Sequence, residues 1–473
     1  MPAANDSSVQ NRSPQQKCVQ QLREHADADL FFNVLTDDGM LDKLESLLPE
    51  HRERLYTPTQ TLSLFLAQAM SEDRSCQHAV NQWFVARQVA GFSAISTNSA
   101  AYCYARQRLP TPLIRELVRH SGHELQQRAV KPWKWKGRCV KMVDGTTLSM
   151  PDTEENQAQY PQPKTQKAGL GFPLCRLVGI LDLSTGGVID VAFGACEGKG
   201  SGEQGLLRQL LDSCLNKGEV LLGDAFFPSY FLLWTLQMMG VDCLCEQMGG
   251  RGRSTDFRRG VSLGARDHLI TYEKPKVKPD WLSQADYDAA PETMCVREFH
   301  CKAGKGNKGK TLVTTMCCPK RYKKGELKEL YKQRWQIEIN FRHIKTTLGM
   351  DVLSCKTPKM VEKEIWVYLL AYNIIRILMA QAALQAGRLP NTLSFKHCAQ
   401  LWLAWGRHSN EGNQASLNAL FAAMAQNKVG NRPGRIEPRQ RKRRPKPFPL
   451  LQQPRNIARK KIIRHGHESK LAA

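Results

Sequence analysis

The sequence predicts an α/β protein built on a mixed β-sheet with helices on both faces, as three observations indicate. Near Lys136 the hydrophobic period changes from about 3.6 residues to about 2. Beyond it, strand-like and helix-like segments alternate, and acidic residues directly follow two of the apolar runs. With 473 residues and 41% hydrophobic content, the chain is long enough for two or three domains with a sizeable core.

The N-terminal part is predicted to be helical after a disordered start. Residues 1–26 are polar and expected to be disordered. Residues 27–135 have a helical pattern, with Pro58 in the first turn of one short helix and two more helices at 75–89 and after Ser96. The third helix carries Arg106 and Arg108, which a helix-turn-helix would direct towards DNA. An ordinary helical bundle explains the same pattern equally well.

Residues 136–350 are predicted to form the sheet domain. Apolar runs predict five strands, the second and third joined by a hairpin at Ser184-Thr-Gly-Gly187, and the strands are expected at 139–143, 177–181, 188–192, 219–222 and 241–245. Helices are expected at 206–216 and 230–239. The order is three strands, helix, strand, helix, strand and later a long helix, which is the order of a ribonuclease H-like core.

Two further regions complete the predicted organisation. Residues from about 249 to 325 are basic, rich in Gly and Lys and short-stranded, which predicts a β-rich insertion in the sheet domain. Residues 351–427 are predicted to contain two helices, and residues 428–473 form a basic C-terminal tail.

The long helix carries four chemically distinctive residues on one edge. Residues 326–345 contain no Gly or Pro and are rich in good helix formers. At about 100° per residue, Tyr331, Arg334, Glu338 and Lys345 fall within about 60° of one another. This edge places one carboxylate among groups suited to phosphate binding. A surface helix with ordinary ion pairs is the alternative.

Two acidic residues precede that helix at the ends of predicted strands. Asp144 follows strand 139–143 and Asp224 follows strand 219–222. Together with Glu338 they could hold two Mg²⁺ ions, which prefer carboxylate oxygens and can assist phosphodiester cleavage. A strand-end Asp is also a common turn former or helix cap. The competing carboxylates complete no motif and are Asp152, Asp182, Asp190 and Glu246.

The charge of the chain indicates a polyanionic partner. The formal net charge is +24, and residues 428–473 contribute fifteen Lys and Arg against two Glu. Six prolines and dense charge predict that this tail is extended and mobile when free. We expect it to contact DNA phosphates without reading bases, through Arg441, Lys442, Arg443 and Arg444.

Other features limit the location and the ligands. The chain has fifteen dispersed Cys, an odd count without a metal-binding spacing, which is typical of a protein in a reduced cytoplasm. We therefore expect the protein in the cytoplasm. When it is bound to DNA, we expect it to be associated with the nucleoid. The most apolar stretch, 365–384, contains Asn373 and Arg376, so we interpret it as a buried helix and expect no membrane. The run Gly194–Ser201 has the wrong spacing for a phosphate loop, so no nucleotide cofactor is expected.

The motifs together resemble a known family. The helix reads Tyr-x2-Arg-x3-Glu-x6-Lys, and it is preceded in order by Val-Asp-Gly-Thr at 143–146 and Leu-Leu-Gly-Asp at 221–224. This combination resembles the DDE transposases of the insertion sequence 4 family, over roughly residues 30–450. The resemblance implies that Asp144, Asp224 and Glu338 are the catalytic residues and bind two Mg²⁺ ions, with Mn²⁺ as a substitute.

The resemblance also implies roles for the neighbouring residues. In the family, the Tyr and Arg of the motif grip a phosphate near the transposon end and the Lys helps to hold the DNA, which here are Tyr331, Arg334 and Lys345. It favours DNA binding by residues 27–135, with Arg106 and Arg108 as candidate contacts.

The expected function follows from this resemblance. It is a DNA transposase that binds the terminal inverted repeats of its element and catalyses metal-dependent strand cleavage and strand transfer, in a cut-and-paste reaction. Its partners are double-stranded DNA, both transposon ends and target, and at least one further copy of the chain in the end-paired complex. Two alternatives remain: a catalytically inactive DNA-binding regulator derived from a transposase, and a ribonuclease H-like nuclease without strand transfer.

Overall fold

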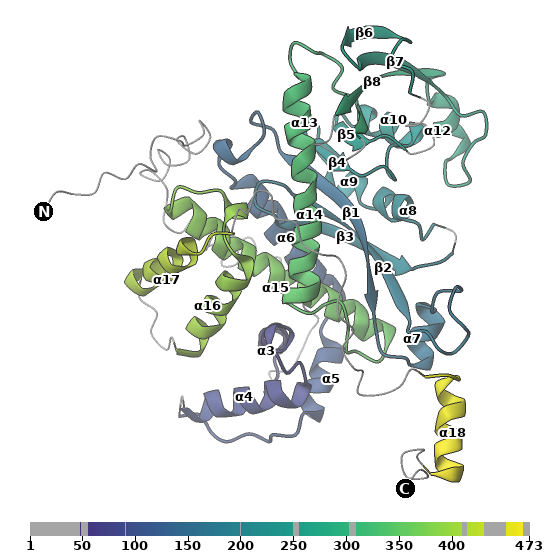
Figure 1. The fold of residues 1–473 in the computed structure, drawn as a ribbon. Coiled ribbons are helices and arrows are strands. Elements are labelled where there is room, and N and C mark those ends of the chain that lie inside the picture. The colour runs from purple at the N-terminus through teal and green to yellow at the C-terminus, as the bar shows by residue number, and fades with distance from the viewer. Residues whose placement is uncertain are drawn as a thin grey trace, which may run out of the picture.

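The computed structural model describes residues 48, 55–89, 91–198, 200–248, 255–301, 309–408, 414–429 and 451–466. A nine-stranded sheet forms the centre of the molecule, in the order β3-β2-β1-β4-β5-β9-β8-β7-β6 (Figure 1). Helices cover both faces of this sheet, as the sequence predicts.

The first five strands form the predicted ribonuclease H-like core. β1 pairs antiparallel with β2, which pairs antiparallel with β3, while β1, β4 and β5 are parallel. These strands are β1 (Val140–Ser149), β2 (Leu174–Asp182), β3 (Val188–Ala195), β4 (Val220–Gly223) and β5 (Asp242–Glu246). Both the order and the strand directions agree with the prediction of a mixed sheet.

The predicted insertion contributes the other four strands and continues the same sheet. They are β6 (Val261–Gly264), β7 (Asp267–Glu273), β8 (Thr293–Cys301) and β9 (Lys310–Thr314), with the short helix α12 (Gln284–Ala289) between β7 and β8. β9 pairs antiparallel with β5. The insertion therefore extends the core sheet at one edge, at the upper right of Figure 1.

Two hydrophobic cores lie on the two faces of the sheet. On one face, a continuous helical run from Lys324 to Thr347 packs together with α6 (Thr111–Gln127) and α15 (Pro358–Gln385). On the other face lie three helices, α8 (Glu203–Arg208), α9 (Leu211–Cys214) and α10 (Tyr230–Met238). Successive side chains of β1 point to opposite faces of the sheet, so Met142 lies in the first core and Val143 in the second.

The long helix α15 is the apolar stretch that the sequence assigns to the interior. It is long and apolar enough to cross a membrane by composition, but 94% of its apolar window is buried inside the protein. Asn373 donates to the carbonyl oxygens of Val118 and Val188 and accepts from the Val188 N–H. A buried amide in these bonds joins α15 to α6 and β3, which confirms the interpretation as a buried helix.

The N-terminal helices form as predicted, but they are not an independent domain. α3 (Pro58–Met70), α4 (Cys76–Val89) and α5 (Ala100–Arg108) share a small core, and α3 also packs on α15. α6 belongs to the hydrophobic core under the sheet, where a Cβ on Gly122 would lie 2.0 Å from the Val188 carbonyl oxygen. The predicted boundary at 135 therefore lies too late in the chain.

The connection between α4 and α5 does not fit a helix-turn-helix. Residues 90–99 separate α4 from α5, whereas a helix-turn-helix joins its helices by a turn of about 3–4 residues. The alternative of an ordinary helical bundle fits the packing of α3, α4 and α5 around one apolar cluster.

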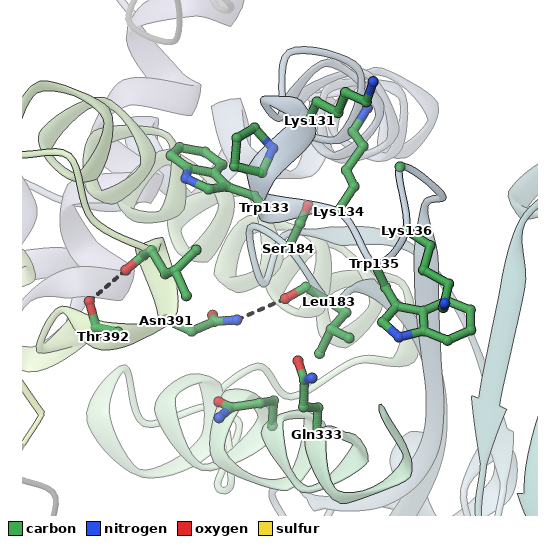
Figure 2. A pocket seen from close by; sticks show the side chains of 14 residues that line it. Lys131, Trp133, Lys134, Trp135, Lys136, Leu183, Ser184, Gln333, Asn391 and Thr392 are labelled. Carbon is green, nitrogen blue, oxygen red and sulfur yellow. Dashed lines mark hydrogen bonds between the residues drawn. The ribbon is translucent and has the colours of Figure 1, made fainter. Parts of the chain in front are cut away.

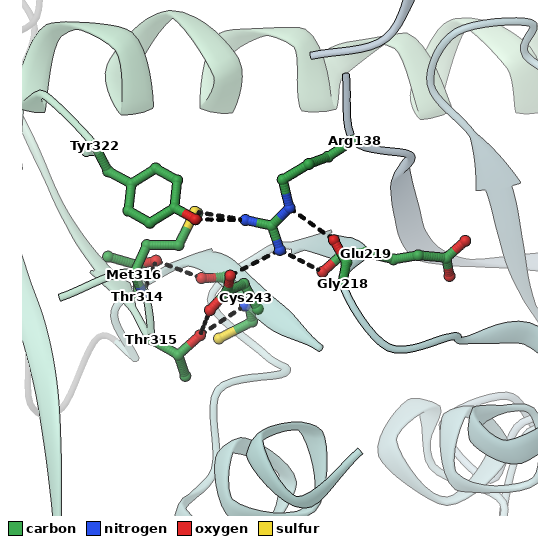
Figure 3. A network of polar contacts seen from close by, with 9 residues as sticks. Arg138, Gly218, Glu219, Cys243, Thr314, Thr315, Met316 and Tyr322 are labelled. Atoms are coloured by element: carbon green, nitrogen blue, oxygen red, sulfur yellow. Dashed lines mark hydrogen bonds and ion pairs between the residues drawn. The ribbon is translucent and has the colours of Figure 1, made fainter. Parts of the chain in front are cut away.

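One arginine connects the beginnings of three neighbouring strands. Arg138 lies just before β1 and donates to the carbonyl oxygens of Gly218 at 2.7 Å and Glu219 at 3.0 Å (Figure 3). It also contacts the Asp242 carboxylate at 2.7 Å and the Tyr322 hydroxyl at 2.9 Å. These contacts join the beginnings of β1, β4 and β5 to the segment that precedes the helix from Lys324. They therefore also fix the positions of the other ends of these three strands relative to one another.

The C-terminal region differs from the prediction in two ways. The two helices predicted after residue 350 are α15 and α16 (Phe395–His408), and the described residues contain two further α-helices, α17 (Gln414–Gln426) and α18 (Arg455–His465). α18 lies in the tail that the sequence predicts to be extended, and none of its residues is buried. The reason is local: residues 455–465 contain no Pro or Gly. Arg441, Lys442, Arg443 and Arg444 lie outside the described residues.

Candidate active site

The register of two parallel strands brings Asp144 and Asp224 to neighbouring positions. β1 pairs with β4 from Val140 opposite Val220 to Met142 opposite Leu222. Two residues further along each strand, Asp144 and Asp224 occupy the same level of the sheet edge. Asp224 directly follows β4, as predicted.

Asp144 lies inside its strand and not at the end of it, which corrects the prediction. β1 continues to Ser149 because β2 pairs with it as far as Leu174 opposite Ser149. Asp144 itself pairs with Gly179 of β2, and a Cβ on Gly179 would lie 3.3 Å from the Phe341 ring. The glycine therefore lets the helix that carries Glu338 pack closely over Asp144.

The predicted long helix is continuous but not uniform. It consists of α13 (Lys324–Lys332), a 3-10 turn at Gln333–Trp335, α14 (Gln336–Arg342) and a π turn at His343–Thr347. Arg334 lies in the tighter turn and Lys345 in the wider one. Such local departures from α-helix geometry are frequent at functional sites.

Arg334 joins two of the three predicted carboxylates. Its Nη1 atom lies 3.6 Å from Asp144 Oδ2, and its Nη2 atom donates to Glu338 Oε1 at 2.8 Å. The Arg334 side chain is 13% exposed, against 19% for Asp144 and 32% for Glu338. The guanidinium group thus lies between carboxylates from a strand and a helix, at a partly open edge.

The charges at this edge influence one another. The pKa of Asp144 is raised to about 6, mainly because the side chain is buried, with the negative charges of Asp224 and Glu338 adding to the shift. The Gly145 N–H and Arg334 act in the opposite direction. The surrounding groups therefore do not fully stabilise the negative charge of Asp144. A bound cation would stabilise this charge.

The other two motif residues contact strands β5 and β1 of the same sheet. The Tyr331 hydroxyl donates to Glu246 Oε2 at 3.4 Å, at the end of β5, and burial raises the pKa of Tyr331. Lys345 donates to Thr146 Oγ1 at 3.0 Å and to the Thr147 carbonyl oxygen at 2.9 Å, just past Asp144 on β1. Burial lowers the pKa of Lys345, with Asp351 opposing the shift.

The donor set suits a hard divalent cation, although it is not already gathered around one point. Asp144, Asp224 and Glu338 offer carboxylate oxygens of the kind that Mg²⁺ and Mn²⁺ prefer. Within the described residues, no three His, Cys, Asp or Glu side chains converge as a metal site. The Arg334 cation lies between two of the carboxylates instead, so their convergence on a metal requires the guanidinium group to move away.

One neighbouring carboxylate is missing from the sequence prediction. Glu203 at the start of α8 approaches Gly145 so closely that a Cβ there would lie 2.4 Å from Glu203 Oε1. Burial and the nearby Asp224 raise the pKa of Glu203. Glu203 lies in the first turn of α8, and the glycine directly after Asp144 is the signal that could have indicated a close neighbour.

The competing carboxylates have structural partners. Asp182 accepts hydrogen bonds from Ser184 and from Thr185 in the β2–β3 hairpin. Asp190 pairs with Arg119 of α6 at 2.6 Å. These bonds account for both residues without catalysis.

Arg106 is not a DNA contact, contrary to the prediction. Its side chain is buried, and its guanidinium nitrogens lie 2.7 Å from Cys76 Sγ and 3.2 Å from Cys355 Sγ. The guanidinium carbon lies 3.9 Å from the Phe65 ring centroid. Arg106 therefore belongs to the packing of α5, while Arg108 is exposed at the end of the same helix.

Comparison with known proteins gives results consistent with this geometry. A family model described as "Transposase DDE domain" matches residues 135–374. "Transposase InsG for insertion sequence element IS4" of Escherichia coli (strain K12) is 28% identical over 361 residues, covering 74% of this chain and 78% of that protein. A solved structure of piggyBac transposase, a synaptic complex with hairpin DNA, covers 87% of this chain and 88% of its own, with a TM-score of 0.44 and 10% identity.

The mixed sheet with this strand order defines a ribonuclease H-like protein. The matched family region covers more than half of the chain. The chain belongs to the DDE transposases, and it is similar to a transposase of insertion sequence element IS4. It is a DNA transposase, in a family of DNA-binding enzymes that use divalent metal ions.

Proposed function

We propose that Asp144, Asp224 and Glu338 are the catalytic carboxylates of this transposase and bind two Mg²⁺ ions, with Mn²⁺ as a substitute. The proposal rests on the register of two adjacent parallel strands, which places Asp144 and Asp224 side by side. Arg334 contacts both Asp144 and Glu338 and so joins the third carboxylate to this pair. Such a pair of ions activates the attacking oxygen and neutralises the leaving oxygen in phosphodiester cleavage.

Arg334, Tyr331 and Lys345 position the DNA strand at this edge. Arg334 exchanges its carboxylate partners for a backbone phosphate, because the planar guanidinium group can bind phosphate through two parallel hydrogen bonds. Tyr331 offers a hydroxyl donor from the β5 side, and Lys345 offers a positive charge beyond Asp144. The three side chains thus hold the scissile strand from both sides of the carboxylates.

The reaction has two stages. Water cleaves the strand at each transposon end, and the released 3′-hydroxyl then attacks a phosphodiester of target DNA, displacing a new 3′-hydroxyl there. The enzyme binds the terminal inverted repeats of its element, and two copies at least act on the paired ends. The partly open carboxylate edge favours this function over a retired DNA-binding regulator.

The test is a cleavage assay with duplexes taken from the DNA that flanks the reading frame. Asp144→Asn, Asp224→Asn and Glu338→Gln should each lower Mg²⁺-dependent cleavage by at least about 1,000-fold, or roughly 4 kcal/mol. Affinity for the same duplex should remain within a few-fold. Asp152→Asn is the matched control, since this loop carboxylate follows β1 but pairs with Arg455, and it should cleave normally.

A second assay separates transposition from simple nuclease activity. A pre-cut end with a free 3′-hydroxyl is incubated with a supercoiled plasmid and Mg²⁺, and joined products are measured. Joining that depends on the same three carboxylates supports strand transfer. Cleavage without joining would assign the chain to the nuclease alternative, and neither activity in the wild type would assign it to the regulator.

A further inference from the structure

A separate pocket, lined by apolar side chains together with lysines and amides, lies next to the helix that carries Glu338. It has a volume of about 840 Å³ and is bordered by the segment 131–137 before β1, the β2–β3 hairpin, the start of the 3-10 turn at Gln333 and the segment 389–392 (Figure 2). The same helix therefore forms part of this pocket and of the carboxylate edge.

The pocket lies across the helix from the carboxylates. Gln333 and Gln336 line the pocket, whereas Arg334 and Glu338 point to β1. At about 100° per residue, Gln336 is displaced by about 200° from Glu338, so the two side chains leave the helix on nearly opposite sides. A ligand in the pocket would not compete with the carboxylates for the same space.

The charge of the pocket has one sign. Three lysines, Lys131, Lys134 and Lys136, lie among the fourteen described residues that line it, and none of these fourteen is acidic. Lys136 pairs with Glu326 at 2.9 Å. For Lys131 and Lys134, no carboxylate of the described chain lies within ion-pair distance of 4.0 Å. The pocket thus carries two positive charges that an anionic ligand can use.

The walls of the pocket are held in place without a ligand. Asn391 donates to the Leu183 carbonyl oxygen at 2.8 Å, which joins the 389–392 segment to the hairpin (Figure 2). Trp135 stacks on Tyr322 with ring centroids 6.0 Å apart, and the Lys136 ammonium group lies 5.8 Å from the Trp135 ring centroid. A preformed site loses little conformational freedom on binding.

We infer that this pocket binds the phosphodiester backbone of a DNA strand that passes on the far side of the helix from the carboxylates. Lys131 and Lys134 supply point charges, and Gln333 and Gln336 supply neutral amide donors. Lysine charges without acidic or fixed base-reading groups suit phosphates of any sequence. The strand comes either from the DNA flanking the transposon end or from the target, and both present the same backbone chemistry.

The first test measures the salt dependence of DNA affinity for the double variant Lys131→Gln/Lys134→Gln, using a random-sequence duplex of thirty base pairs. Each lost phosphate contact should reduce the slope of log affinity against log salt by about 0.9, or about 1.8 for two. The variant Lys356→Gln/Lys359→Gln removes two exposed lysines at the same spacing and should keep the wild-type slope.

The variant Lys131→Arg/Lys134→Arg keeps both charges and should restore the slope. Equal slopes for wild type and Lys131→Gln/Lys134→Gln, with an unchanged circular dichroism spectrum, would overturn the inference. So would an equal loss in the Lys356/Lys359 control, because the effect would then reflect net charge alone. A change in oligomeric state with an unchanged slope would assign the pocket to contact between two copies of the chain.

A second pair of measurements identifies the source of the strand. If the flank occupies the pocket, Lys131→Gln/Lys134→Gln weakens binding to ends that retain ten flanking base pairs but not to pre-cut ends. If target DNA occupies it, the variant binds both ends normally and joins pre-cut ends to a plasmid several-fold less well. Unchanged results in both measurements would contradict the inference, while loss of cleavage in Asp144→Asn tests the carboxylates separately.

Discussion

The regions around Arg334 and Arg106 differ in what each guanidinium group can reach. Arg334 contacts two carboxylates at an edge where Glu338 keeps 32% of its side chain exposed. Arg106 is 6% exposed and contacts the thiols of Cys76 and Cys355 inside the protein.

The difference shows when an arginine is available to a ligand. The partners of Arg334 are anions that a cation can neutralise, so the guanidinium group can be released towards a phosphate. The partners of Arg106 are the buried thiol of Cys355 and the half-buried thiol of Cys76, and any movement outward would leave an unfilled volume beside Phe65. The first arginine can take part in a reaction, whereas the second maintains the position of α5.

The largest expected effect concerns the buried arginine. Arg106→Ala should lower the free energy of unfolding by about 3 kcal/mol, because it leaves a cavity and removes the contacts that join α5 to Cys355 before α15. Denaturant unfolding measures this change. Arg108→Ala on the same helix is the control and should change stability by less than about 0.5 kcal/mol. If Arg106→Ala and Arg108→Ala were equally stable, Arg106 would not have the structural role that distinguishes it from Arg334.

The next effect concerns the arginine at the carboxylate edge. Arg334→Lys should lower cleavage about 10- to 100-fold, equivalent to about 1.5–3 kcal/mol for a charge-assisted contact. Protein stability should hardly change. Arg342→Lys, at an exposed position on the same helix, should cleave like the wild type. Normal cleavage by Arg334→Lys would show that a point charge is sufficient.

A smaller effect links the carboxylate edge to stability. The pKa of Asp144 is raised to about 6 mainly by burial, above its unfolded value of about 3.9. Ionisation of Asp144 therefore costs stability above pH 6, and the cost disappears as pH falls through 6 towards 4. Without metal, Asp144→Asn should be more stable than the wild type by roughly 1–2 kcal/mol at pH 7.5.

Thermal unfolding across pH checks this sign. The difference between Asp144→Asn and the wild type should vanish below about pH 4, and Mg²⁺ should reduce it at pH 7.5 by stabilising only the wild type. A variant that is less stable than the wild type at pH 7.5 in the absence of metal would contradict the prediction.

The smallest effect concerns Arg108. Because this side chain is exposed at the end of α5, Arg108→Ala should weaken DNA binding by at most about 0.5–1 kcal/mol if it touches a phosphate. Fluorescence anisotropy with a labelled duplex measures this change. An equal loss for inverted-repeat and random duplexes would mean that Arg108 reads no bases, and a loss for the repeat alone would restore a recognition role for α5.

The catalytic part of the fold was predictable because its signals are local. Short apolar runs predict β1 and β4, and a stretch of good helix formers without Gly or Pro predicts the helix that carries Glu338. The parallel register then places Asp144 beside Asp224, which requires only the strand order. The full length of β1 was not predictable, because its last residues form a strand through pairing with β2 and not through their own apolar pattern.

The errors share a physical cause. A helical period identifies an apolar face but not the surface on which it packs, so α6 was assigned to a separate domain although it packs on β3 and α15. Likewise, the thiol of Cys355 that contacts Arg106 lies 249 residues away in the sequence. Contacts over such separations leave no local pattern, and they decide whether a basic residue on a helix is exposed.

The continuous sheet fixes the position of the insertion relative to the strand that precedes Asp224. β9 is hydrogen-bonded to β5, and β5 to β4, which Asp224 directly follows. Two strand spacings of about 4.8 Å each separate β9 from β4. β7 and β6 are the outermost strands on this side of the sheet and do not pair with β5. A slip of one residue between β5 and β9 would turn every insertion side chain to the opposite face, so tolerance to mutation should be lowest at this junction.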